Sequence, residues 1–106
     1  MIRQFEKDRL RILVFETREE MGECAAADIE TYCRDQLSRK DEINMVFAAA
    51  PSQDDVLASL VKKDLPWDRI NAYHMDEYVG LDRSDPHSFG YYLDTHLFSL
   101  VPFKSV

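Results

Sequence analysis

The chain has 106 residues, enough for one domain, and 45% of them are hydrophobic, so a packed core is expected rather than disorder. Its 20 acidic and 13 basic residues give a net charge of −7, which argues against the basic surface that nucleic-acid binding needs. No signal peptide is evident, and the apolar run at residues 12–15 is far shorter than the ~20 residues of a membrane span. We therefore predict a cytoplasmic protein without nucleic-acid or membrane partners.

The first predicted elements are a strand and a long helix. Residues 11–16 form a β-branched and aromatic run that is typical of a strand. Thr17 and Glu20 then have the spacing of a capping box, which predicts a helix that continues to about Arg39. Apolar residues recur along this helix at helical spacing and predict its buried face: Met21, Ala25, Ile29, Tyr32 or Cys33, and Leu37.

The two cysteines of the chain both lie on this predicted helix. Cys24 and Cys33 are nine residues apart, which places them about 180° apart around the helix axis. They are therefore poor disulfide partners, and their spacing matches no metal site. We predict two reduced thiols, and we expect neither a metal nor a cofactor.

A second strand and helix follow. Residues 43–50 are largely apolar, as in strands that are covered on both faces of a parallel sheet, and Pro51 ends the run. A helix is predicted over residues 52–63, with four apolar residues on its inner face: Val56, Leu57, Leu60 and Val61.

The third predicted strand covers residues 69–75 and is preceded by Trp67. A loop over residues 80–86 then leads to the last predicted helix. Asp85 has the position of its N-cap and Pro86 that of its first helical residue. Four residues are expected to be buried by this helix: Phe89, Tyr92, Leu93 and Leu97.

The predicted order of elements is therefore βαβαβα. Strands that alternate with helices predict an α/β fold with a Rossmann-like parallel sheet and flanking helices, in one domain over residues 1–106. Three parallel strands rarely form a finished sheet, and no closing element follows the last helix. We therefore expect an incomplete domain whose free sheet edge favours self-association or a homo-oligomer.

Two loops at the carboxyl ends of predicted strands are candidate sites, because ligands of open α/β sheets bind there. The first loop, residues 48–53, is a run of small residues that opens onto a helix N-terminus and could hold an anion. The candidate phosphate-binding residues are Ala49, Ala50, Ser52 and Gln53. By spacing alone, the favoured interpretation is an ordinary helix cap formed by Ser52, with Asp55 three residues on.

The second loop follows the third predicted strand and holds two adjacent carboxylates, Asp76 and Glu77. Successive residues of an extended chain point to opposite sides, so one carboxylate is expected to face the crevice while the other pairs with a neighbouring structural group. A carboxylate in this position could be a general base that removes a proton next to a carbonyl. From the residues alone, a solvated acidic turn is the favoured alternative.

Residues 75–81, with the sequence MDEYVGL, closely resemble the glucosamine-6-phosphate deaminase/isomerase family. The similarity extends from about residue 10 to the end and includes residues 86–90 and 101–103. The resemblance implies an enzyme that isomerises an amino-sugar phosphate and releases ammonia. It also implies that Asp76 moves a proton between C1 and C2 of the opened sugar, with Glu77 in support, and that residues 49–53 hold the phosphate.

Two features depart from that family. Its phosphate loop is usually a Gly-Ser/Thr-Thr-Pro turn, whereas residues 49–53 read Ala-Ala-Pro-Ser-Gln and lack glycine, which leaves the identity of the sugar phosphate open. The family's ring-opening histidine and phosphate-binding lysine lie downstream of the matched region, and His74, His87 and His96 do not replace that histidine. We therefore expect this chain alone to be inactive. Two alternatives stay open, a non-catalytic sugar-phosphate sensor and a related sugar-phosphate lactonase.

Overall fold

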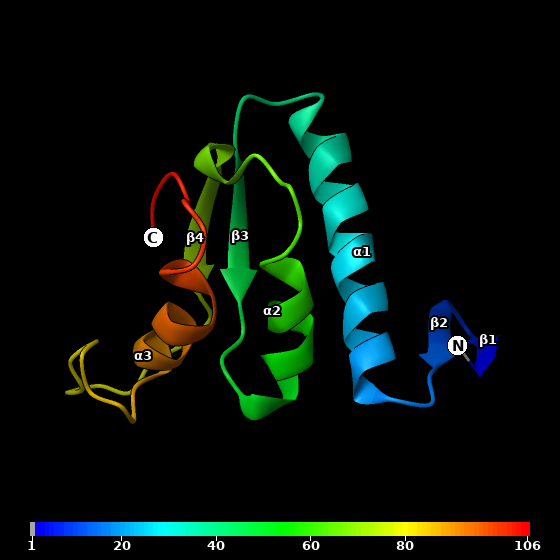
Figure 1. Ribbon diagram of the computed structural model, residues 1–106, viewed down its shortest axis with the longest axis horizontal. Helices are drawn as coiled ribbons and strands as arrows, with labels where there is room; N and C mark the ends of the chain where they lie inside the picture. Colours follow the sequence, from blue (N-terminus) through cyan, green and yellow to red (C-terminus); the bar gives the residue numbers. More distant parts are fainter. Residues whose placement is uncertain (1) are drawn as a thin grey trace.

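The computed structural model describes residues 2–106. It contains a β-hairpin, a parallel two-stranded sheet and helices that pack around this sheet (Figure 1). The mixed α/β class that the sequence predicts is confirmed. The strands and α-helices are β1 (Arg3–Lys7), β2 (Leu10–Val14), α1 (Arg18–Leu37), β3 (Ile43–Phe47), α2 (Asp54–Leu60), β4 (Ile70–His74) and α3 (Phe89–Leu93). Two 3-10 helices, η1 (Pro51–Gln53) and η2 (Trp67–Arg69), and a π-helical segment, η3 (Asp94–Phe98), complete the order.

Strands β3 and β4 form the parallel sheet. They pair in register along their whole length, and Phe47 lies opposite His74 at the carboxyl end. The segment after η3 runs along the other edge of β4, where the N–H of Ala72 donates to the Ser105 carbonyl at 2.8 Å. Both edges of β4 are therefore covered, whereas the other edge of β3 has no paired strand within residues 2–106 (Figure 1).

One hydrophobic core lies between this sheet and the helices. Helix α1 packs against α2, α2 also contacts η3, and α3 contacts β4. No described residue of the β1–β2 hairpin belongs to this core. The buried residues that form it are Ala26, Cys33, Leu37, Phe47, Leu57, Leu60, Leu65, Trp67, Ile70, Ala72, Leu93, Leu97, Phe98 and Val101.

The first strand differs from the prediction. Strand β2 pairs antiparallel with β1 and does not join the parallel sheet. The predicted order βαβαβα is found from β2 onward, but the expectation that its first strand belongs to the parallel sheet is wrong. Asp8 makes the tight turn possible, because its φ of 56° lies in the left-handed region that Asp tolerates. A hairpin closes a very short loop, whereas pairing with β3 would first require the long α1 connection to be ordered. The hairpin lies on the far side of α1 from β3 (Figure 1).

Helix α1 begins as predicted. The Thr17 hydroxyl accepts a hydrogen bond from the Glu20 N–H at 3.1 Å, and the helix ends at Leu37, slightly before the predicted end. Its buried face includes Cys33 but not Tyr32, whose side chain is 66% exposed. Both cysteines are free, as predicted. In the described part of the chain, no helix is long and apolar enough to span a membrane.

The last helix starts later than the prediction. Its N-cap is Ser88, whose hydroxyl accepts from the Tyr91 N–H at 3.0 Å, rather than Asp85. Asp85 instead accepts the N–H of His87 at 2.9 Å and forms a local turn. The predicted burial is confirmed for the fully buried Leu93 and Leu97, while the other two residues named, Phe89 and Tyr92, are half-buried.

The contact between α1 and α2 generates a first prediction. A Cβ atom at Gly22 would lie 2.6 Å from the backbone oxygen of Asp55, closer than packed atoms approach. Alanine has the higher helix propensity by about 1 kcal/mol, so any loss of stability in Gly22→Ala must come from this clash. We expect a net destabilisation of about 1–3 kcal/mol, measured by thermal or urea unfolding. Glu23→Ala, on the exposed side of α1, is the control and should change stability by less than about 0.5 kcal/mol. A Gly22→Ala protein as stable as the parent would contradict the close contact.

Candidate active site at the carboxyl end of the sheet

The carboxyl ends of β3 and β4 lie side by side and bring the two candidate loops together. The N–H of Met75 donates to the Phe47 carbonyl at 2.9 Å, so the pairing continues to the last residue of β3. Residues 48–53 and residues 75–81 leave the sheet from this common edge. Because β3 and β4 pair directly, both segments follow neighbouring strands.

The first loop is extended and then tightens into η1. Strand β3 ends at Phe47, before the predicted end, and Ala50 has extended backbone angles. Ala49 and Ala50 are half-buried, whereas Ser52 is exposed. No side chain caps η1 or α2, so the predicted helix cap by Ser52 is wrong. Within residues 2–106 the Ser52 hydroxyl has no hydrogen-bond partner, and it stays available to a ligand.

Tyr92 of α3 contacts this first loop. Its hydroxyl lies 2.7 Å from the Ala50 carbonyl and 2.6 Å from a carboxylate oxygen of Asp54. Burial, reinforced by the Asp54 carboxylate, raises the pKa of Tyr92 far above its usual value, so the hydroxyl keeps its proton and acts as a donor. His96 stacks on the Tyr92 ring with the ring centroids 4.1 Å apart. From the sequence, Tyr92 is predicted only to be buried, because no motif links it to the loop.

Charges around the first loop are mixed. Asp54 and Asp55 occupy the first turn of α2, where they compete with any anion for the N–H groups. Arg18 at the start of α1 offsets them in part: it donates to the Pro51 carbonyl at 3.1 Å and pairs with Asp55 at 2.9 Å. Sequence reasoning missed Arg18, since it lies more than 30 residues from the loop in the chain. Among the residues described, no group of three His, Cys, Asp or Glu is placed to hold a metal ion.

Asp76 lies at the start of the second loop and is exposed to solvent. Its backbone carbonyl is 2.9 Å from Nδ1 of His74, the last residue of β4. Its carboxylate has no hydrogen-bond or ion-pair partner in the described part of the chain. The side chain is therefore not committed to holding the fold.

Glu77 has the opposite role. Its carboxylate accepts hydrogen bonds from the N–H groups of Tyr78 at 2.9 Å, Phe89 at 3.0 Å and Gly90 at 2.8 Å, and so ties the second loop to the start of α3. Gly90 permits this approach, since a Cβ there would lie 3.2 Å from the carboxylate. Partial burial raises the pKa of Glu77, but the three backbone donors outweigh it and leave the pKa below its usual value. The expected division between a structural and a free carboxylate is found, with Glu77 as the structural one.

Several matched relatives share one printed name. A glucosamine-6-phosphate deaminase of Bacillus thuringiensis is 30% identical over 95 residues, which is 90% of this chain and 35% of the relative. A protein of the same name from Listeria welshimeri is 42% identical over 64 residues, 59% of this chain and 27% of the relative. This chain is a relative of the glucosamine-6-phosphate deaminases. It spans about a quarter to a third of their length. No protein-family model matches the sequence.

Solved structures show the same fold. A monomeric glucosamine-6-phosphate deaminase superposes with a TM-score of 0.72 at 22% identity, over 87% of this chain and 37% of that chain. A 6-phosphogluconolactonase from Shewanella baltica gives 0.76 at 16% identity, over 86% of this chain and 40% of that chain. The Rossmann-like architecture shared by the deaminases and lactonases is therefore confirmed for this chain.

The Glu77 contacts generate a second prediction. A carboxylate whose pKa is lower in the folded than in the unfolded state stabilises the fold above the unfolded value of about 4.3, and this contribution is lost as pH falls through the folded pKa. Glu77→Ala should therefore lower the midpoint of thermal unfolding at neutral pH, and the difference from the parent should shrink in acid. Asp76→Ala is the matched control and should leave the midpoint unchanged. Equal effects of the two variants would contradict the structural role of Glu77.

Proposed function

We propose that residues 1–106 are the N-terminal part of an enzyme of the glucosamine-6-phosphate deaminase type, which isomerises an amino-sugar phosphate and releases ammonia. The observation that carries this proposal is the uncommitted carboxylate of Asp76. It lies beside the small-residue loop at the carboxyl end of the sheet, while its neighbour Glu77 is fully engaged. A free carboxylate and an anion-accepting loop at one edge are what proton transfer on a sugar phosphate needs.

Each loop has a separate role in this proposal. Asp76 acts as the base that removes a proton from the carbon next to the carbonyl of the opened sugar and returns it to the neighbouring carbon. The phosphate is held by the first loop, through the backbone N–H groups of Ala49 and Ala50, the Gln53 side chain and the unoccupied hydroxyl of Ser52. The backbone N–H of Gln53 already donates to the Ala50 carbonyl at 2.9 Å. Arg18 offsets the acidic first turn of α2. Glu77 supports the site by fixing the second loop against α3.

The 106-residue chain by itself is proposed to be inactive. Asp76 is open to solvent, whereas a base that acts at carbon needs a site that excludes water. None of the three histidines faces Asp76 as a second catalytic group: the His74 ring contacts the Asp76 backbone, His87 is exposed, and His96 stacks on Tyr92. Groups that act together in ring opening and proton transfer fail together when one is missing. The cytoplasmic location and the absence of nucleic-acid and membrane partners stay predictions.

The third prediction tests the role of Asp76 in the product of the complete gene. We expect Asp76→Asn to reduce ammonia release from glucosamine-6-phosphate by at least about 100-fold, because general-base catalysis contributes about 100- to 10,000-fold. Binding of the sugar phosphate, measured by calorimetry, should be retained, since the amide has nearly the same shape. Asp82→Asn, at an exposed carboxylate directly after this loop, is the control and should keep full turnover.

Two other outcomes would replace this proposal. Binding of the sugar phosphate without turnover, unchanged in Asp76→Asn, would indicate a sugar-phosphate sensor, which the glycine-free loop favours. Hydrolysis of a sugar-phosphate lactone in place of ammonia release would indicate a lactonase, whose fold the chain shares. Self-association through the free edge of β3 is a separate expectation of the same incomplete sheet.

A further inference from the structure

The first loop, residues 48–53, is held by side chains from two helices that lie on opposite sides of α2 (Figure 1). The Tyr92 hydroxyl of α3 lies 2.7 Å from the Ala50 carbonyl. The guanidinium of Arg18, at the start of α1, donates to the Pro51 carbonyl at 3.1 Å. Two consecutive carbonyls of the loop are therefore fixed by residues 42 and 33 positions away in the chain. We call these two contacts the loop clamp.

The loop depends on such contacts because its backbone alone does not select one conformation. Ala50 is extended, with φ of −164° and ψ of 156°, and any residue can adopt these angles. Pro51 restricts only its own φ. The order of the loop must therefore come in large part from the side chains that hold its carbonyls.

Tyr92 is itself restrained on two sides. Its ring stacks on His96 with the centroids 4.1 Å apart, and its hydroxyl is also 2.6 Å from a carboxylate oxygen of Asp54. Burial, with the Asp54 carboxylate adding to the effect, raises the pKa of Tyr92, so the hydroxyl keeps a proton that it shares between Asp54 and the Ala50 carbonyl. Because the ring and the hydroxyl are already placed, holding the loop costs little additional side-chain entropy.

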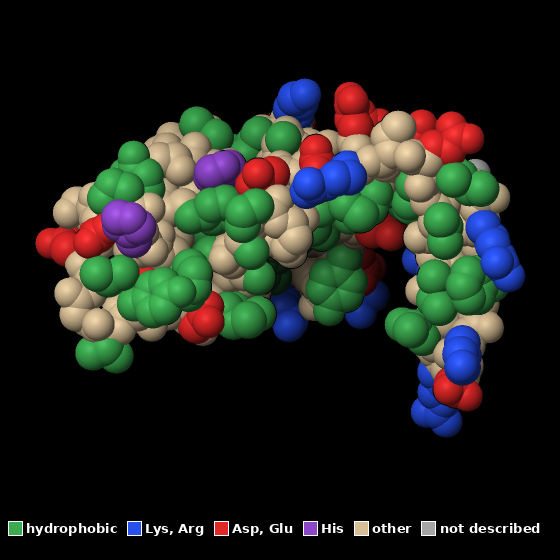
Figure 2. Space-filling model, turned by 90° about the horizontal axis from the view of Figure 1, so that it is seen from below, with side chains coloured by type: hydrophobic (Ala, Val, Ile, Leu, Met, Phe, Trp, Pro, Cys, Tyr) green, Lys and Arg blue, Asp and Glu red, His purple; other side chains and the backbone are tan. Residues whose placement is uncertain are grey.

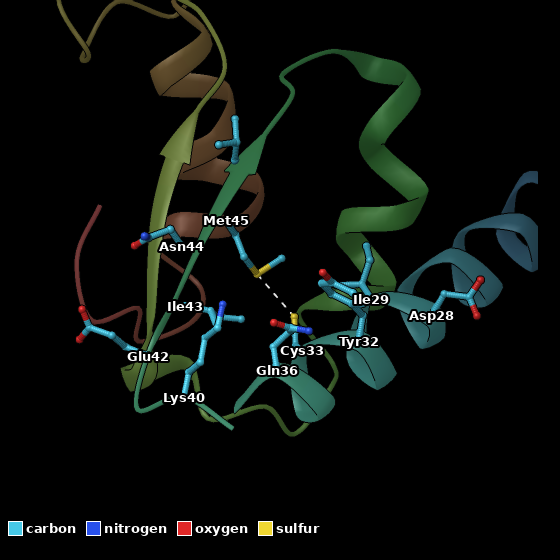
Figure 3. A pocket seen from close by; sticks show the side chains of 11 residues that line it. Asp28, Ile29, Tyr32, Cys33, Gln36, Lys40, Glu42, Ile43, Asn44 and Met45 are labelled. Carbon is cyan, nitrogen blue, oxygen red and sulfur yellow. Dashed lines mark hydrogen bonds between the residues drawn. The ribbon is translucent and has the colours of Figure 1, made fainter. Parts of the chain in front are cut away.

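Arg18 is restrained in a similar way, since it also pairs with the Asp55 carboxylate at 2.9 Å. This end of α1 packs closely on α2 at Gly22. Further along α1, a groove lies between the helix and β3, and Figure 3 shows Cys33 and Met45 facing one another there, with their sulfur atoms 3.6 Å apart. Helix α1 therefore reaches the first loop through its first turn.

Helix α3 supports the second loop as well as the first. The Glu77 carboxylate accepts the N–H groups of Phe89 and Gly90, and Tyr92 lies two residues after Gly90. The same short helix thus contacts the loop that carries Asp76 and the loop that is proposed to hold the phosphate. Catalysis by proximity requires such fixed placement of a base relative to its bound substrate.

The charge of this end of the molecule makes the placement of single donors important. Figure 2 looks onto the carboxyl ends of β3 and β4 and shows acidic side chains next to basic ones. The chain as a whole has a net charge of −7. A phosphate is therefore not attracted by the overall field, and its binding depends on donors that the loop holds in position.

We propose that Tyr92 and Arg18 are positioning residues, which hold the first loop in the conformation that binds the phosphate of the substrate. This inference rests on the proposed function, because it takes the first loop as the phosphate site. Neither residue moves a proton in the reaction. Loss of either contact weakens phosphate binding in the ground state and the transition state alike, so KM rises and kcat stays nearly unchanged.

The fourth prediction tests the clamp in the product of the complete gene. Tyr92→Phe removes the hydroxyl and keeps the ring that stacks on His96. We expect the KM for glucosamine-6-phosphate, and the dissociation constant of inorganic phosphate in calorimetry, each to rise at least about fivefold, with kcat within about twofold. Tyr91→Phe is the matched control, because the Tyr91 hydroxyl has no hydrogen bond within residues 2–106, and it should change neither constant.

Arg18→Lys is a second variant, which keeps the positive charge. An ammonium group cannot reproduce the forked contact of the guanidinium with the Pro51 carbonyl and the Asp55 carboxylate. We expect the same rise in both constants, whereas a residue that only offset charge would tolerate the change. Thermal unfolding verifies that each variant folds. If Tyr92→Phe does not fold, phosphate binding unchanged in Arg18→Lys overturns the clamp.

The readouts separate this inference from the proposed function. Equal constants for Tyr92→Phe and Tyr91→Phe, in a parent protein that releases ammonia, would overturn the clamp alone. A fall in kcat of Tyr92→Phe with unchanged phosphate binding would also overturn it. Weaker phosphate binding in Tyr92→Phe, in a parent that releases no ammonia, would support the clamp and overturn the proposed reaction. A parent that binds neither inorganic phosphate nor the sugar phosphate would overturn both.

Discussion

The parallel pairing of β3 with β4 is the constraint on which the rest of the structure depends. It buries Ile70 and Ala72 completely and gives the helices a surface to cover. Because the strands are parallel and in register, their carboxyl ends coincide, and the Met75 N–H still reaches the Phe47 carbonyl. Two loops that lie more than 20 residues apart in the chain thereby share one edge. Without this pairing, Asp76 and the small-residue loop would have no reason to be neighbours.

The sequence predicts this part of the fold because composition decides it. A largely apolar run at residues 43–50 and a second strand run at residues 69–75, separated by an amphipathic helix, predict two parallel strands. The expected cover on both faces is wrong for β3 within the described residues, since Val46 is 62% exposed. The run at residues 11–16 is also predicted correctly as a strand, but an apolar run does not show which strand it pairs with. Residues 3–7 form the partner strand, which the turn at Asp8 brings next to β2. Closing this short hairpin loop costs less entropy than pairing β2 with the distant parallel sheet.

The sequence predicts which two loops form the candidate site, but it does not predict the contacts of their individual side chains. The motif at residues 75–81 indicates both Asp76 and Glu77 as candidates. Because successive residues of an extended chain point to opposite sides, the two carboxylates are expected to have different roles, but the sequence does not show which one is structural. That choice depends on backbone donors at Phe89 and Gly90, which arrive only when α3 packs beside the loop. The contact between Tyr92 and the first loop depends on the same tertiary packing, and no local pattern announces it.

The two-stranded parallel sheet leaves two regions open to solvent within residues 2–106, and they lie in different places. At the carboxyl ends of the strands, Asp76 is exposed to solvent. Along β3, the groove extends from Val46 to Lys40 beside α1, toward the amino end of the strand. The groove beside α1 and the two loops at the carboxyl ends are therefore separate surfaces of this fold.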